Sequence, residues 1–96
     1  MSMPSGSQPA SGPFARAITE AIRLAMTRRR VSGAQLAERT SRSQTYISKR
    51  LRNEVPFTAN DIEEICKALD EDLMKLLYAA AREMAHARKS DGPPKG

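Results

Sequence analysis

The chain has 96 residues, enough for one small domain with a short segment at each end. Hydrophobic residues make up 40% of it but aromatic residues only 4%, which favours a modest core of aliphatic side chains on helices. The net charge is +5, and the sequence contains neither an apolar run of about 18 residues that could span a membrane nor the apolar segment of a secretion signal in residues 1–13.

Cysteine and histidine each occur once, as Cys66 and His86. A lone cysteine cannot form a disulfide within the chain, which fits a reducing, cytoplasmic compartment. These two residues are too few for a metal site of the usual kind. The sequence also shows no paired carboxylates and no set of nucleophile, base and orienting group, so we expect no enzyme, no cofactor and no small-molecule ligand.

Positive charge is concentrated in the first part of the chain. Residues 1–55 hold ten of the 16 Lys and Arg residues against three acidic ones, a net charge of +7, whereas residues 56–96 carry −2. Such asymmetry is typical of a protein with an anionic partner on one side. Nucleic acid is the first candidate, and an acidic membrane surface is the second.

Residues 1–13, rich in Ser, Gly and Pro, predict a disordered arm, and residues 89–96 predict a disordered tail. Between them, residues 14–88 predict one all-α domain of five helices. The first helix, residues 14–29, has one apolar stripe that includes Ile18, Ile22 and Ala25. Its C-terminal end carries three arginines, residues 28–30, which suit the helix dipole and could also reach phosphates.

Two short helices follow. The second has Ser32 as its expected N-cap and turns Leu36 and Ala37 inward. The third opens with Ser43 as its expected N-cap and runs to about residue 52. Because so few residues join them, these helices must cross at a large angle and pack on the other three.

The fourth helix has the clearest start signal, with Thr58 as cap and Asp61 at the third helical position of a capping box. The fifth is expected over residues 72–88 and has two apolar stripes. One consists of Leu73, Leu77, Ala80 and Met84, and the other of Met74, Tyr78, Ala81 and Ala85. The second stripe is either the far edge of a broad buried face or a contact surface for a homodimer.

The third helix has two unlike faces. Ile47 and Leu51, four residues apart, predict the side that packs on the domain. The opposite side carries amide, hydroxyl and cationic groups and no carboxylate; these residues are Gln44, Thr45, Ser48, Lys49 and Arg52. Such groups can contact base edges and phosphates in a major groove, which is wide enough to admit one helix.

Residues 36–77 resemble the helix-turn-helix of phage repressors and Cro proteins, also called Xre-like. Ala37 matches the small residue in the middle of the family's second helix, Ile47 matches the anchor of its recognition helix, and Ile-Cys-Lys-Ala-Leu at 65–69 matches the end of its fourth helix. The chain departs from the family at Gly33, where a phosphate-contacting Gln is common, and at Ser41, where the turn usually has Gly. Leu51 falls one position later than the family's second anchor.

The resemblance implies a compact, lambda-repressor-like domain with its helix-turn-helix at helices 2 and 3, binding a double-stranded DNA operator. The implied function is transcription regulation by a phage or prophage immunity repressor, or by a Cro-like repressor, through promoter occlusion. The resemblance and the positions of the residues together assign base contacts to Gln44, Thr45, Ser48 and Lys49. They assign phosphate contacts to Gly33, Arg42, Ser43, Tyr46, Arg50, Arg52 and Asn53.

Two other hypotheses remain open at this point. An antitoxin or excision-control protein would bind DNA but also a protein partner, through the second stripe of the fifth helix. A helical interaction module would use the same cations to bind an acidic protein or lipid surface.

Overall fold

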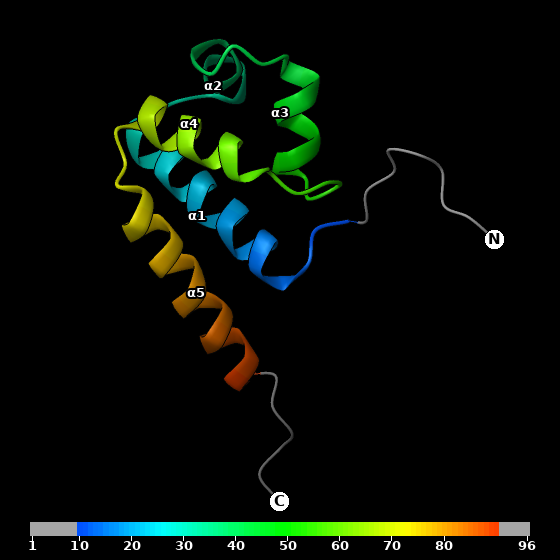
Figure 1. Cartoon of the computed structure of the whole chain (residues 1–96), viewed down its shortest axis with the longest axis vertical. Coiled ribbons are helices and arrows are strands. Elements are labelled where there is room, and N and C mark those ends of the chain that lie inside the picture. Colours follow the sequence, from blue (N-terminus) through cyan, green and yellow to red (C-terminus); the bar gives the residue numbers. More distant parts are fainter. Residues whose placement is uncertain (1–9, 91–96) are drawn as a thin grey trace, which may run out of the picture.

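The computed structural model describes residues 10–90, with side chains as far as residue 86, and within this range all regular structure is helical (Figure 1). The helices are α1 (Pro13–Arg29), α2 (Gly33–Arg39), α3 (Gln44–Leu51), α4 (Ala59–Leu69) and α5 (Leu73–Ser90). The expected all-α class and the order of the five helices are confirmed. Residues 1–9 and 91–96, most of the expected arm and tail, lie outside the described residues.

Helix boundaries at both ends of the domain differ slightly from those expected. Pro13 occupies the first turn of α1, where its missing N–H costs nothing, and α5 continues to Ser90 rather than residue 88. Ser11 is buried, and its N–H donates to the Asn53 carbonyl oxygen at 3.3 Å. The packed part of the chain therefore starts before residue 14.

The expected N-caps are confirmed at three helices. The Ser32 hydroxyl accepts from the Gln35 N–H in a capping box, the Ser43 hydroxyl accepts from the Tyr46 N–H, and the Thr58 hydroxyl accepts from the Asp61 N–H in a second capping box. Each bond satisfies a backbone donor that the helix itself leaves unpaired. These caps fix where α2, α3 and α4 begin.

A residue in the left-handed conformation follows each of the first four helices within two residues, and none of these residues is glycine. In each case the next residue's N–H donates to a carbonyl five residues earlier, which closes the helix end. The left-handed residues are Arg30, Ser41, Asn53 and Asp70, with φ between 55° and 63°. Ser41 lies in the turn between α2 and α3, at the position where the family that the sequence resembles usually has Gly.

The core is aliphatic and draws on all five helices. Its fully buried large side chains include Ile22 of α1, Leu36 of α2, Ile47 of α3, and Ile65 and Leu69 of α4. Cys66 is a buried member of the same core, as a small hydrophobic residue usually is.

Helix α5 packs mainly on α1 through the first expected stripe, in which Ala80 is buried and Leu73, Leu77 and Met84 are partly buried. Leu76, which belongs to neither expected stripe, is buried together with Ala80, and Leu73 and Leu77 flank them. The second stripe is largely exposed: Met74 is 68% exposed and Tyr78 is 73% exposed. Leu76 therefore widens the expected first stripe on one side, and the second stripe is not buried with it.

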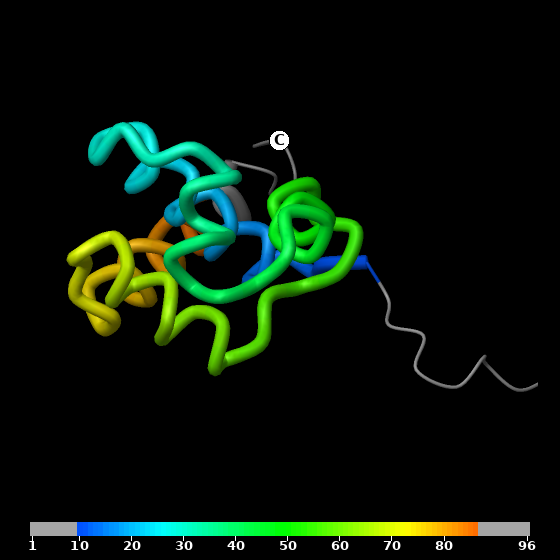
Figure 2. Tube along the Cα trace, turned by 90° about the horizontal axis from the view of Figure 1, so that it is seen from above, coloured from blue at the N-terminus to red at the C-terminus, as the bar shows by residue number. Residues whose placement is uncertain are grey.

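The arrangement places α3 at the edge of the molecule. Figure 1 shows α1 passing between α3 and α5, and Figure 2 shows α3 at one side of the molecule. Within the described residues α3 contacts α1 and α2 but not α5. One long side of α3 therefore remains open to a partner while its opposite side is braced by the domain.

Candidate nucleic-acid interface

The helix-turn-helix is formed by α2, the turn at residues 40–43, and α3. Ala37 is almost completely buried, so its small side chain lets α2 and α3 approach closely. The buried Thr40 hydroxyl donates to the Leu36 carbonyl oxygen at 2.8 Å, and Ser41 then reverses the chain in its left-handed conformation. Ile47, buried behind α3, anchors that helix on the core.

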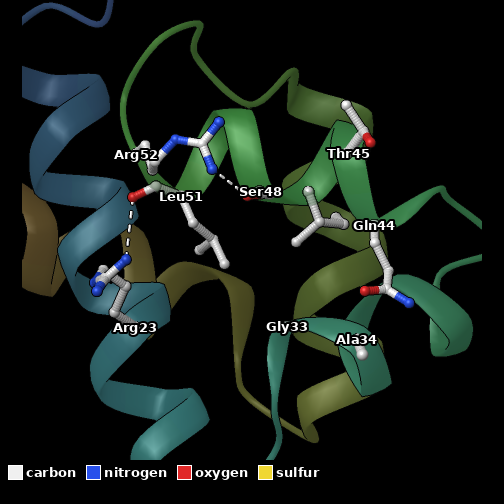
Figure 3. A pocket seen from close by; sticks show the side chains of 9 residues that line it. Arg23, Gly33, Ala34, Gln44, Thr45, Ser48, Leu51 and Arg52 are labelled. Atoms are coloured by element: carbon white, nitrogen blue, oxygen red, sulfur yellow. Dashed lines mark hydrogen bonds between the residues drawn. The ribbon is translucent and has the colours of Figure 1, made fainter.

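The outer face of α3 lines an open groove of about 550 Å³ (Figure 3). Gln44, Thr45 and Ser48 come from α3, and Gly33 and Ala34 come from the start of α2. The rest of the lining consists of Arg23, Ile47, Leu51 and Arg52, so no carboxylate lines it. The expected base-contacting residues Gln44, Thr45 and Ser48 are thus brought together, while exposed Lys49 lies outside this groove.

The start of α2 adds backbone donors to the groove. The capping box uses the N–H groups of Ser32 and Gln35, and the Gly33 and Ala34 N–H groups are among those that every helix start leaves without an intrahelical partner. A Cβ at position 33 would meet only the Leu51 side chain, at 3.8 Å, which is ordinary contact. Gly33 is therefore not required by packing.

Arg52 is an exposed cation at the C-terminal end of α3. Its guanidinium pairs with the Glu54 carboxylate at 2.7 Å and also donates to the Ser48 hydroxyl, as Figure 3 shows for Ser48. Both partners of the ion pair are about half exposed, so the pair contributes little to stability and can be exchanged for a phosphate. Arg23 of α1, on the other side of the groove, donates to the Leu51 carbonyl oxygen at 3.1 Å.

Three of the expected phosphate contacts converge instead on the buried carboxylate of Asp61. Arg42 Nε donates to Asp61 Oδ1 at 2.7 Å, and the Tyr46 hydroxyl lies 2.8 Å from Oδ2. Arg50 Nε lies 3.7 Å from Oδ2, and its guanidinium stacks on the Tyr46 ring at 3.5 Å from the centroid. The Thr58 N–H also donates to Oδ2, at 2.9 Å. We call these five residues the Asp61 cluster.

Burial and hydrogen bonding act in opposite directions on Asp61. Burial alone would raise the pKa of this carboxyl group, but the hydrogen bonds from Thr58, Tyr46 and Arg42 outweigh burial and hold the pKa below its usual 3.8. The same pairing raises the pKa of Arg42, against the effect of its own desolvation. Asp61 is therefore a charged partner in the folded protein.

The remaining expected phosphate contacts have mixed environments. Ser43 is exposed at the start of α3, where its hydroxyl already caps the helix. Asn53, which follows α3 and has a left-handed backbone, is half-buried. The arginines at the end of α1 lie elsewhere: Arg28 and Arg29 both pair with Glu71, at 3.4 and 3.1 Å, beside the turn between α4 and α5. Their position favours a role in holding that turn.

Two residues of this surface escaped the sequence reasoning. Asp61 was expected only as a capping residue, and the sequence analysis gave Arg23 no role. The capping box predicted only that the Asp61 carboxylate contacts the backbone at the start of its own helix. Nothing in the neighbouring sequence places Arg23 beside Leu51, 28 residues away. Both roles depend on how distant helices pack.

Among the described residues, no group of three His, Cys, Asp or Glu side chains is placed to hold a metal ion. No described helix is long and apolar enough to cross a bilayer.

No protein-family model matches the chain, and no curated protein matches its sequence. Solved structures do resemble it. One structure of the clp gene regulator ClgR from Corynebacterium glutamicum has a TM-score of 0.74 and 26% identity, over 86% of this chain and 88% of that one. A second ClgR structure has a TM-score of 0.70 and 24% identity, over 77% and 96%.

The hypothetical transcription factor NHTF from Neisseria is also similar, with a TM-score of 0.63 and 22% identity over 79% of this chain and 84% of that one. All three structures are of proteins described as transcription regulators or factors. The five-helix domain with its helix-turn-helix therefore has the fold of helical transcription regulators.

Proposed function

We propose that this protein is a sequence-specific regulator of transcription that binds double-stranded DNA with α3 in the major groove. The observation that carries the proposal is the outer face of α3. It brings an amide, hydroxyls and a cation together in a groove without carboxylates, beside the start of α2. The fold shared with transcription regulators supports the same conclusion.

The proposed roles follow from position and chemistry. Gln44 can pair with both N6 and N7 of an adenine, and Thr45, Ser48 and Lys49 are the further base contacts. Phosphate contacts come from the Gly33 N–H, Ser43, Arg52 and Asn53, which set the register of the domain on DNA without reading sequence. This contact set omits Arg42, Tyr46 and Arg50, because their polar groups are already engaged with Asp61.

Repression by promoter occlusion is the simplest regulatory mechanism for such a domain, because a tightly bound protein denies polymerase access without a second activity. A phage or prophage origin rests on the resemblance of residues 36–77 alone. Selection of binding sites from a random duplex pool tests the proposal directly. A recurring motif is expected, and footprinting on it should protect bases that depend on α3.

Two variants separate base readout from general attraction. Gln44→Ala should change the preferred base at one position, a contact worth about 1–3 kcal/mol of discrimination. Arg52→Gln should weaken binding by a similar factor on every sequence. Lys75→Gln, which removes one positive charge from an exposed position on α5, is the control for the loss of charge. If the protein is instead a helical module that binds acidic partners, Gln44→Ala should have no effect, and the loss of binding affinity should depend only on the charge removed.

A protein partner on α5 is favoured by one specific observation, the exposure of Met74 and Tyr78. We propose this surface, with Ala81 and Ala85, as the contact for a second copy of the chain. An antitoxin or excision-control protein would use it for another protein instead. Light scattering should report a dimer that Tyr78→Lys converts to a monomer, and a two-fold symmetric DNA motif would agree with it. A monomer at all concentrations together with an asymmetric motif would exclude the dimer.

A further inference from the structure

Asp61 has surroundings that no other carboxylate of the described residues shares. It is 1% exposed, the only buried acidic side chain in that range, and it lies at the first turn of α4. Its single negative charge faces two guanidinium groups, those of Arg42 and Arg50. Burying ions is costly, so such a cluster persists in a small domain only where the geometry is favourable, and it suggests a task beyond stability.

The contacts of Asp61 act on the position of α3. Arg42 directly precedes the N-cap of α3, and Tyr46 and Arg50 lie one turn apart on the side of α3 that faces α4. Ile47 and Leu51 hold α3 to the core on an adjacent side. A rotation of α3 by one residue, about 100°, would separate both Tyr46 and Arg50 from Asp61.

The cluster also withholds positive charge from solvent. The side chains of Arg42 and Arg50 are 17% and 14% exposed. The side chain of Arg52, which directly follows α3, is 56% exposed. The Arg42 guanidinium is further committed to the Thr40 carbonyl oxygen at 2.6 Å, and that of Arg50 to the Tyr46 carbonyl oxygen at 3.2 Å. Both guanidinium groups are thus held by contacts within the domain.

We propose that Asp61 is a positioning residue for DNA specificity, which fixes the rotation of α3 and keeps Arg42 and Arg50 from the phosphate backbone. This inference rests on the proposed DNA-binding function. Phosphate contacts strengthen binding to every sequence and add no discrimination between sites. By holding the guanidinium groups of Arg42 and Arg50 within the domain, Asp61 lowers affinity for arbitrary DNA while it keeps Gln44, Thr45 and Ser48 in place.

The test compares Asp61→Asn with Glu63→Gln, which removes the same charge from an exposed position on α4. Dissociation constants are measured against salt concentration for a selected site and for a random duplex, and circular dichroism monitors folding. Asp61→Asn should steepen the salt dependence on random DNA by about 0.9 in log–log slope for each guanidinium released. If the variant and the wild type bind random DNA equally at 1 M salt, one released guanidinium group makes the variant bind it about eightfold more tightly at 0.1 M.

The released guanidinium groups should strengthen binding to every sequence, whereas only the selected site loses base contacts when α3 is no longer held in place. The ratio of specific to non-specific affinity should therefore fall in Asp61→Asn, and Glu63→Gln should change it little. If Glu63→Gln has the same effect, net charge alone is responsible and the inference is wrong. It is equally wrong if folded Asp61→Asn keeps the wild-type slope and ratio.

A second pair of variants decides the question even if Asp61→Asn does not fold. Arg52→Gln should reduce the salt slope by about 0.9, as loss of one phosphate contact does, whereas Arg50→Gln should leave the slope unchanged and reduce only the preference for the selected site. An equal loss of slope in Arg50→Gln would show that Arg50 binds a phosphate and would overturn the inference. Failure of the wild-type protein to prefer any sequence would instead refute the proposed function, and the inference would fall with it.

Discussion

Ser41→Gly should stabilise this protein, although glycine usually destabilises a folded chain. Ser41 has φ of 58° in the turn between α2 and α3, a conformation that costs a residue with a Cβ about 1–2 kcal/mol. Its N–H donates to the Glu38 carbonyl oxygen at 3.1 Å, and its side chain is exposed. The substitution thus removes a strained Cβ while it keeps the backbone bond that closes the turn.

The opposing effect is the greater freedom of glycine in the unfolded chain, which costs about 0.5–1 kcal/mol. Relief of strain is the larger effect, so the free energy of unfolding should rise by about 0.5–1 kcal/mol. For a domain of this size, such a change corresponds to a rise in Tm of about 2–8 °C. Urea unfolding followed by circular dichroism measures it, with an unchanged dependence on denaturant.

Two neighbouring substitutions serve as controls. Ser41→Ala keeps the Cβ and should give no gain in stability. Ser43→Gly removes the N-cap of α3, whose hydroxyl accepts from the Tyr46 N–H at 3.0 Å, and should cost a few tenths of a kcal/mol. If Ser41→Gly is no more stable than the wild type, or if Ser41→Ala gains as much, the left-handed conformation of Ser41 does not cost the folded protein the expected free energy.

Further expectations concern the core and two titrating groups. Ile47→Ala should lower the free energy of unfolding by about 2–5 kcal/mol, because it leaves a cavity behind α3, and chemical denaturation measures the loss. The folded pKa of Asp61 lies below 3.8, so the stability from its carboxylate is present above pH 3.8 and is lost as pH falls through that folded pKa. In acid unfolding followed by circular dichroism, Asp61→Asn should not show this loss of stability. Burial, followed by the charges of Glu71 and Asp72, raises the pKa of the Cys66 thiol, so a thiol reagent at pH 8 should modify it slowly until urea is added.

The sequence determined the features that depend on residues close together in the chain. Apolar spacing of three and four residues located the helices, and the caps at Ser32, Ser43 and Thr58 were evident because a cap joins a side chain to an amide three residues later. The two faces of residues 44–52 followed from the same periodicity. The class, the order of the helices and the composition of the outer face of α3 were therefore predictable.

Only the tertiary structure decided which polar groups are available for a partner. Asp61 meets Arg42 and Tyr46 across 19 and 15 residues, and Arg23 meets Leu51 across 28. The choice of Leu76 rather than Met74 and Tyr78 as the buried side of α5 likewise depends on α1. The physical reason is that a cation has the same local signature whether it faces solvent or a buried carboxylate, because its partner is selected by how helices pack and desolvate it.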